Sequence, residues 1–258
     1  MLYLLQKGGD AMLRLQISNL SHLGYNNGWE NYSEHSDKLE LYSALHPTRI
    51  FVRMNTQNTF RIDIPHGRLH HEMHRAYPKH FNGVAFYIND EDAFCGFLRR
   101  AAGIDSSLPD QPLRIATKRL HEELATLGTY TTETERLLKT RIGQQVFRES
   151  LLAYWGERCA VTGLDIPEAL RASHIKPWAQ CSSDAERLDV FNGFLLSANL
   201  DALFDRNLIT FDATGKIQYL VPFSSAQKAH LGLHDNSALR WIEPEHIAYL
   251  RHREMPTM

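Results

Sequence analysis

The stretch RASHIKPW (171–178) is followed, after a short connection, by FNGFLLSANLDALFDRNLITFD (191–212), and together they decide the fold of the C-terminal half. The run ASHI predicts a short β-strand, which Pro177 halts. FLL predicts a second strand, and SANLDALFDR predicts a helix. LITFD and KIQYLV predict two further strands, joined by a hairpin turn at Asp212–Gly215. Asp201 and Asp205 stand four residues apart, so they share one face of that helix. The two stretches therefore place a histidine and two carboxylates on a strand–strand–helix unit.

The side chains of this unit suit metal-assisted hydrolysis. His174 lies in the first predicted strand, and an imidazole with its ordinary pKa of about 6.5 can take a proton from water near neutral pH. Two carboxylates that converge on one point, as those of Asp201 and Asp205 would, suit a hard divalent cation such as Mg²⁺ or Mn²⁺. Asn192-Gly193 favours a tight turn before the second strand. A base on a strand and carboxylates on the following helix make a single hydrolytic site.

These motifs resemble the HNH nuclease family, in the branch that carries AHI-x-P-W, NG-x-LL and LFD-x-G. The matching text in this chain is AVTG, ASHIKPW and NGFLLSANLDALFDRNLITFD, and the resemblance covers roughly residues 140–220. It implies the ββα-metal fold, in which two strands and a helix surround one metal ion. It also implies hydrolysis of a phosphodiester bond.

The resemblance assigns a role to each matching residue. His174 matches the family's general base, which activates water. Asn192 matches the middle Asn, which holds the loop and helps to orient the base by hydrogen bonding. Asp201 stands at the third motif position, a metal ligand that is often His. Asp205 stands where some HNH nucleases have a second metal ligand.

Three positions depart from the family pattern. Ser173 precedes the base, where many HNH proteins have Asp or His as a further ligand. Asp201 replaces the third histidine, which shifts the expected metal from Zn²⁺ toward Mg²⁺ or Mn²⁺. Asn207 stands where the branch usually has Gly. Asn tolerates the left-handed conformation that ends a helix, so the helix is still expected to end there.

Length and composition bound the class of protein. The 258 residues allow one large domain or two of ordinary size, and 43% apolar with 22% charged residues is typical of globular proteins. A net charge of −2 gives no general attraction to nucleic acid, so any contact must be local. No apolar run is long enough to span a membrane. Three widely spaced cysteines favour a reducing, cytoplasmic location over a disulfide framework.

The N-terminal half mixes strand and helix patterns. Residues 49–54 and 59–64 alternate apolar and polar side chains, so they predict two strands of a hairpin. Residues 83–90 predict a more buried strand, and residues 90–103 predict a helix that Asp90 or Asp92 caps and Gly103 ends. We therefore expect an α/β or mostly β domain over residues 1–110.

The chain changes character after the first domain. Two prolines among small polar residues predict a linker, which we place at residues 111–130. A helical pattern then begins near Thr132, the predicted N-cap, and Gly143 either weakens this helix or splits it in two. The HNH domain would occupy residues 131–258 and end in a helix that packs on its core. The predicted class of the whole chain is α+β.

Basic side chains suggest contact with DNA. Cationic residues lie among aromatic ones between residues 49 and 80, a composition that suits phosphate contact and base stacking, although a solvated basic loop would look the same. Others flank the predicted site and could hold phosphates without recognising sequence. The candidate nucleic-acid-binding residues are Arg61, Arg68 and Arg75 in the first half, and Arg171, Lys176 and Arg206 beside the site.

The sequence thus predicts a metal-dependent DNA endonuclease. A target-selecting domain fused to an HNH nuclease is typical of restriction or phage-defence enzymes, including those that act on modified DNA. A homodimer would fit, because one HNH site cuts one strand at a time. Two alternatives stay open: a nucleic-acid-binding protein with a degenerate HNH fold, and an HNH nuclease that acts on RNA.

Overall fold

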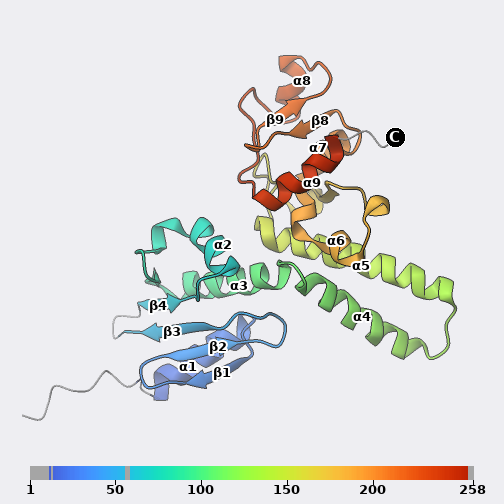
Figure 1. Cartoon of the computed structure of the whole chain (residues 1–258). Helices are drawn as coiled ribbons and strands as arrows, with labels where there is room; N and C mark the ends of the chain where they lie inside the picture. The colour runs from blue at the N-terminus through green and yellow to red at the C-terminus, as the bar shows by residue number, and fades with distance from the viewer. Residues whose placement is uncertain (1–11, 13, 56–58, 255–258) are drawn as a thin grey trace, which may run out of the picture. The chain divides into compact units, whose positions relative to one another are not determined.

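The chain forms two compact units. The computed structural model describes residues 12, 14–55 and 59–254, and it divides the chain into Met1–Ser106 and Ser107–Met258. Figure 1 draws the first unit in blue to teal and the second in green to red. Both units contain helices and strands, which confirms a mixed α and β class. Within the described ranges, no helix is both long and apolar enough to cross a bilayer.

The N-terminal unit is built on a five-stranded antiparallel sheet in which strands adjacent in sequence are adjacent in space. Alternate residues of the strands at 39–42, 50–54 and 60–63 are buried, and Phe94 of a later helix stacks on Phe60 of the sheet at 4.1 Å between ring centroids. The strands are β1 (Asn31–Glu34), β2 (Leu39–Tyr42), β3 (Ile50–Met54), β4 (Phe60–Asp63) and β5 (Phe86–Ile88); the helices are α1 (Arg14–Asn26), α2 (Arg68–Ala76) and α3 (Glu91–Ser107).

Some predictions for this unit are confirmed and others are wrong. The predicted strands appear as β3, β4 and β5, and the predicted helix as α3. Asp90 accepts a hydrogen bond from the Ala93 amide at 2.8 Å, so it caps α3, but the helix continues past Gly103. The unit is neither α/β nor mostly β. Short connections between most strands leave no room for crossover helices, so the sheet is antiparallel and the helices come before, between and after its strands.

The segment predicted as a linker is largely helical. Residues Gln111–Leu127 form α4, with Pro112 in its first turn, where proline is tolerated. The next helix, α5 (Thr132–Trp155), lies against α4 and is capped by Thr131, one residue before the predicted cap. It runs through Gly143 without a break. Leu113, Ala116, Leu120 and Leu124 recur at helical spacing along α4, a pattern that the prolines before it obscured.

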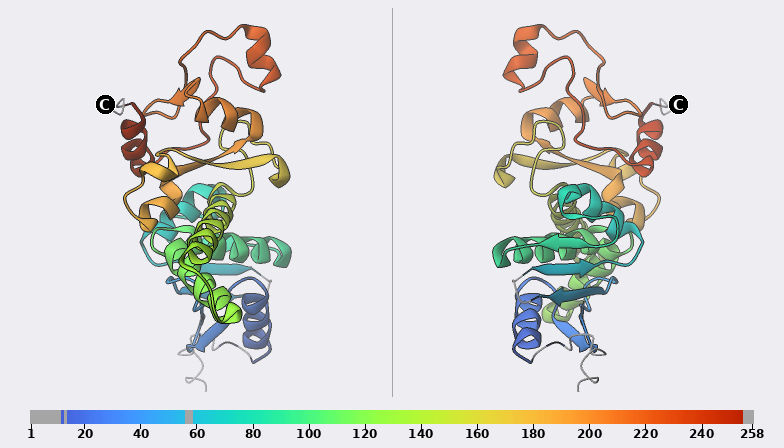
Figure 2. Two further views of the ribbon diagram at one scale, coloured as in Figure 1. Left: turned by 90° about the vertical axis from the view of Figure 1, so that its right-hand side faces the viewer. Right: turned by 90° about the vertical axis from the view of Figure 1, so that its left-hand side faces the viewer.

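The rest of the second unit consists of short elements, and several of those between residues 170 and 197 pack on α5. Figure 2 shows the hairpin and small helix at 209–230 extending from the far end of the unit in both views. The hairpin predicted around Asp212–Gly215 is confirmed, because β8 (Ile209–Phe211) and β9 (Ile217–Tyr219) pair antiparallel. The elements are β6 (Leu170–His174), α6 (Asp184–Leu188), β7 (Gly193–Ser197), α7 (Ala198–Asp205), β8 (Ile209–Phe211), β9 (Ile217–Tyr219), α8 (Ser225–His230) and α9 (Pro244–Glu254), with 3₁₀ turns at 167–169, 178–180 and 190–192.

Candidate active site

Two antiparallel strands and the helix that follows them form the centre of the second unit. β6 and β7 pair over five residues each, with His174 opposite Gly193, and α7 begins directly after β7 and packs on both strands. Every residue of β7 is buried. Asn207 has φ +54° just after α7, so the expected left-handed residue at the helix end is confirmed.

Gly193 serves a different purpose from the one predicted. Its φ of −162° is extended, and the turn before β7 lies at 189–192, where the Asn192 amide donates to the Asp189 carbonyl at 2.9 Å. A Cβ at Gly193 would lie 2.5 Å from the Phe147 ring and 3.0 Å from Leu151. The prediction of a tight Asn192-Gly193 turn was therefore wrong. Glycine is required because α5 approaches the strand too closely for a side chain.

The close approach of α5 holds the imidazole of His174. The ring stacks on Phe147 with centroids 3.8 Å apart and planes 17° apart. Trp178 meets the same imidazole edge-on at 5.5 Å. Trp178 in turn lies over Gly143, where a Cβ would be 2.8 Å from the indole. Two aromatic rings thus fix the plane of His174, and both glycines leave the space that the rings need.

A backbone carbonyl sets the tautomer of His174. The Nε2 atom lies 2.9 Å from the carbonyl oxygen of Arg187. A carbonyl can only accept, so Nε2 carries the proton, and the neutral ring has its lone pair on Nδ1. Burial lowers the pKa of His174, although the bond to Arg187 acts in the opposite direction. The imidazole is therefore held neutral and able to accept a proton at Nδ1 near neutral pH.

Asn192 ties the chain beyond His174 to helix α6. Its side chain is fully buried, its Oδ1 accepts from the Lys176 amide at 2.8 Å, and its Nδ2 donates to the Glu186 carbonyl at 3.1 Å. The next carbonyl along α6 is that of Arg187, which accepts from His174. The amide thus connects two backbone segments that flank the imidazole.

Arg187 was not identified from the sequence. Its guanidinium donates to the carbonyls of Trp178 at 3.2 Å and Cys181 at 2.8 Å, and to Asp184 at 2.9 Å. These bonds hold the 178–188 connection in place and with it the carbonyl that His174 meets. No sequence signal marks such a residue, because every residue has a carbonyl.

The two aspartates of α7 have different surroundings. The Ser173 hydroxyl donates to Asp201 Oδ1, so Ser173 orients this carboxylate. Asp205 lies one turn later and is more exposed. Burial and the negative charge of Asp201 raise the pKa of Asp205, while Arg253 and Arg206 act in the opposite direction. The two carboxylates therefore lie close enough to repel each other.

This donor set fits a hydrated divalent cation. In the described part of the chain, neither Asp201 nor Asp205 forms an ion pair with Lys or Arg, so an added positive charge would relieve their repulsion. Within the described residues, no group of three possible ligand atoms from His, Cys, Asp or Glu lies close together around these two aspartates. Mg²⁺ keeps several waters and is bound through one or two carboxylates, whereas structural zinc takes four protein ligands.

An open groove joins His174 to the acidic side of α7. Its volume is about 520 Å³, and Ser173, His174 and Asp205 all line it. Two further lining residues, His252 and Arg253, come from α9, nearly eighty residues along the chain from β6. We expected the C-terminal helix only to pack on the core, so these two residues were missed.

The basic residues predicted beside the site differ in availability. Lys176 pairs with Glu186 at 2.6 Å and is largely buried, so its charge is already matched. Arg171 is exposed and donates to the Glu168 carbonyl at 2.9 Å. Arg206 is exposed at the end of α7 and donates to the Ala202 carbonyl at 3.2 Å. Arg171 and Arg206 are therefore the better placed of the three to meet a phosphate.

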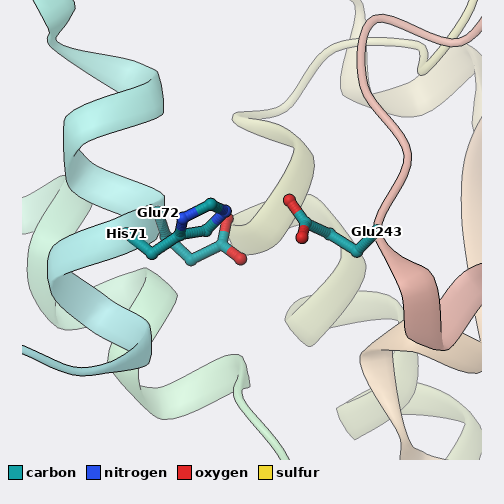
Figure 3. Close-up of side chains that lie close together, drawn as sticks. All are labelled: His71, Glu72 and Glu243. Carbon is teal, nitrogen blue, oxygen red and sulfur yellow. The ribbon is translucent and has the colours of Figure 1, made fainter.

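The basic residues predicted in the N-terminal unit already have carboxylate partners. Arg61 on β4 pairs with Asp63 at 2.9 Å. Arg68 and Arg75 on α2 both pair with Glu72. Figure 3 shows Glu72 projecting from α2 with His71 beside it. Phosphate contact by these arginines would have to compete with the acids that hold them.

The part of the chain that matches a known family contains the strands and the helix of this site. Residues 159–212 match the family described as HNH endonuclease, a span that begins shortly after α5 and contains β6, α6, β7, α7 and β8. The C-terminal half contains an HNH domain. An HNH domain indicates a nuclease and, with it, DNA binding, and HNH nucleases typically use a divalent metal. Comparison of the whole chain with curated proteins finds no match.

Proposed function

We propose that the HNH domain is a metal-dependent DNA endonuclease of the ββα-metal type, in which His174 takes the proton from the attacking water. The observation that carries this proposal is the bond between His174 Nε2 and the Arg187 carbonyl. It leaves the basic Nδ1 free on a ring that two aromatic side chains hold still. A fixed, neutral imidazole is what general base catalysis requires.

The other site residues support the base. Asn192 holds α6, and with it the Arg187 carbonyl, in place beside His174. Asp201, oriented by Ser173, and Asp205 would hold Mg²⁺ or Mn²⁺. Such an ion, when bound, stabilises the negative charge that develops on the phosphate and on the leaving 3′ oxygen. Exposed Arg171 and Arg206 would hold flanking phosphates.

The N-terminal unit would select the target, and the whole protein would act as a restriction or phage-defence enzyme in the cytoplasm. The support is the presence of a separate folded unit with basic and aromatic side chains beside an HNH domain. Targets could include modified DNA. A double-strand break would need two copies of the chain, which sedimentation in the presence of DNA would detect.

The test uses plasmid DNA, modified and unmodified, with Mg²⁺, Mn²⁺, Zn²⁺ or EDTA. Wild-type protein is compared with His174→Ala and with His230→Ala, a matched change at an exposed histidine of α8. We expect metal-dependent cutting that His174→Ala loses by about 10²- to 10⁴-fold while DNA binding survives. His230→Ala should cut normally. Cutting by His174→Ala at the wild-type rate would show that the assignment of the base is wrong.

One observation favours a second candidate, a nucleic-acid-binding protein with an inactive HNH fold. Ser173 occupies a position where many HNH proteins have a metal ligand, and its hydroxyl is already bonded to Asp201. DNA binding without cutting under any of the metals would support this candidate. Cutting of RNA but not of DNA in the same assay would instead identify a ribonuclease.

A further inference from the structure

Helix α9 is anchored in the core of the HNH domain. His246 is fully buried and stacks on Phe194 of β7, with centroids 5.5 Å apart and planes 14° apart. The Tyr249 hydroxyl donates to Asp189 at 2.9 Å, and Leu250 is buried. These contacts fix the position and the rotation of the helix. They therefore also determine where its last turn, with Arg253, meets the groove.

Arg253 bridges the two elements that carry the catalytic side chains. One terminal nitrogen of its guanidinium donates to the Ile175 carbonyl at 3.1 Å, and the other donates to the Phe204 carbonyl. Ile175 directly follows His174, and Phe204 directly precedes Asp205. The guanidinium also lies over the Phe204 ring, 3.9 Å from its centroid.

The bond to Phe204 acts at the C-terminal end of α7. The last carbonyls of a helix lack partners within the helix and carry a partial negative charge, so a cation there is favourable. Arg253 supplies that cation from another helix and joins it to the end of β6 in the same planar group. Arg253 thus ties the β6 end to the α7 end, in addition to the Ser173–Asp201 bond between the same two elements.

We propose that Arg253 is a positioning residue of the nuclease site, which holds Asp205 and the end of α7 in register with His174. This inference rests on the proposed function, because it assigns Arg253 a part in the same reaction. The residue acts through the backbone of its neighbours and need not contact the DNA. The C-terminal helix is then part of the active site as well as of the core.

The geometry also separates this role from a phosphate-binding one. Each terminal guanidinium nitrogen already gives one of its two N–H groups to a carbonyl, and Nε is buried, so paired bonds to a phosphate would have to compete with the bridge. Lysine could not replace arginine in the bridge, because a single ammonium lacks the planar fork that spans two acceptors. It would keep the positive charge beside Asp205. A lysine variant therefore separates position from charge.

The experiment compares Arg253→Met and Arg253→Lys with Arg251→Met in the full chain. Arg251 is exposed and lies two residues earlier on α9, so its variant controls for the loss of one charge there. Thermal unfolding is followed for each variant to confirm folding. Plasmid cleavage gives kcat and KM. Hydrogen exchange at residues 203–208 reports on the end of α7 whether or not the protein cuts DNA.

We expect both Arg253 variants to lower kcat by about tenfold to a hundredfold, with KM for DNA changed less than about twofold. Amides at the end of α7 should exchange about tenfold faster than in wild type. Arg251→Met should match the wild type in both measurements. This pattern, with Lys failing as Met does, would support the inference.

Two outcomes would overturn it while the nuclease assignment stands. In one, all variants cut and exchange alike. In the other, Arg253→Lys cuts normally and Arg253→Met raises KM, which would mean that Arg253 supplies charge to DNA. If wild-type protein does not cut, the proposed function fails, and exchange alone decides the bridge: faster exchange in Arg253→Met supports it, and unchanged exchange overturns it.

Discussion

The β6–β7–α7 region and the N-terminal unit both contain residues that the sequence marked as functional, but the structure treats them differently. In the HNH domain, His174 and Asp205 line one groove, and Asp201 is bonded to a third lining residue, Ser173. In the N-terminal unit, Arg61, Arg68 and Arg75 each pair with a carboxylate on their own strand or helix.

The contrast shows what kind of pattern carries spatial information. Residues on consecutive short elements are forced together when those elements pack, so the spacing of a motif translates into geometry. An excess of cationic residues over a stretch does not show which charges remain free after folding. Four predictions test this difference, in order of expected size.

The largest effect is expected from the carboxylates of α7. Asp201→Asn and Asp205→Asn should each reduce cleavage by about a hundredfold or more, because a weaker cation site loses several kcal/mol of charge stabilisation in the transition state. The Mg²⁺ concentration for half-maximal cleavage should rise. Asp235→Asn, at a highly exposed aspartate, is the matched control. Full activity of Asp201→Asn would remove this aspartate from the site.

A smaller effect, a loss of folding stability, is expected when Gly193 is replaced by alanine. Gly193→Ala places a methyl group 2.5 Å from Phe147, so it should lower the free energy of unfolding by about 1–3 kcal/mol. Gly96→Ala in α3 meets no atom within 4 Å and should be neutral or stabilising by about 0.5–1 kcal/mol. Urea denaturation of both variants measures the contrast, and equal stabilities would contradict it.

Two histidines with lowered pKa values give the third prediction. Burial lowers the pKa of His174, while burial and the neighbouring charges of His66 and His74 lower that of His70. Added salt screens charges, so it should raise the pKa of His70 and leave His174 nearly unchanged. NMR titration of the ring protons at two salt concentrations measures both.

The lowered pKa of His174 also determines how stability and cleavage rate change with pH. The pKa of His174 is lower in the folded protein than in the unfolded chain, so the unfolded chain binds more protons at acidic pH. The contribution of His174 to stability is therefore lost as the pH falls from the unfolded pKa through the folded one. The rate should decline over the same range, because protonation removes the base. A rate that rises as His174 becomes protonated would contradict its role.

The smallest effect is expected from the paired arginines. Changing Arg61, Arg68 or Arg75 to Gln should alter DNA affinity by less than about threefold, because ion pairs with Asp63 and Glu72 already engage these side chains. Arg171→Gln and Arg206→Gln should each weaken binding more and reduce the salt dependence by about one phosphate contact. Fluorescence anisotropy at several salt concentrations measures this. A larger loss from the first set would show that their ion pairs open when DNA binds.

The sequence alone determined the order strand, strand, helix in the HNH domain and the residues that it carries. Periodicity, a halting proline and a four-residue spacing act over short distances, so β6, β7, α7 and the hairpin after them could be predicted. The same local rules gave β3, β4, β5 and α3. They missed β1, whose residues are mostly exposed, and β2, which pairs with it, and they missed α4, whose pattern follows two prolines.

Only the tertiary structure decided how His174 is held. The Arg187 carbonyl, the Phe147 ring and the Arg253 guanidinium reach His174 or its neighbours from 13 to 78 residues away along the chain. Two of these contacts use backbone carbonyls, which all residues share, so no side-chain pattern could mark them. Local sequence selects the chemical groups of this site, and packing between distant segments orients them.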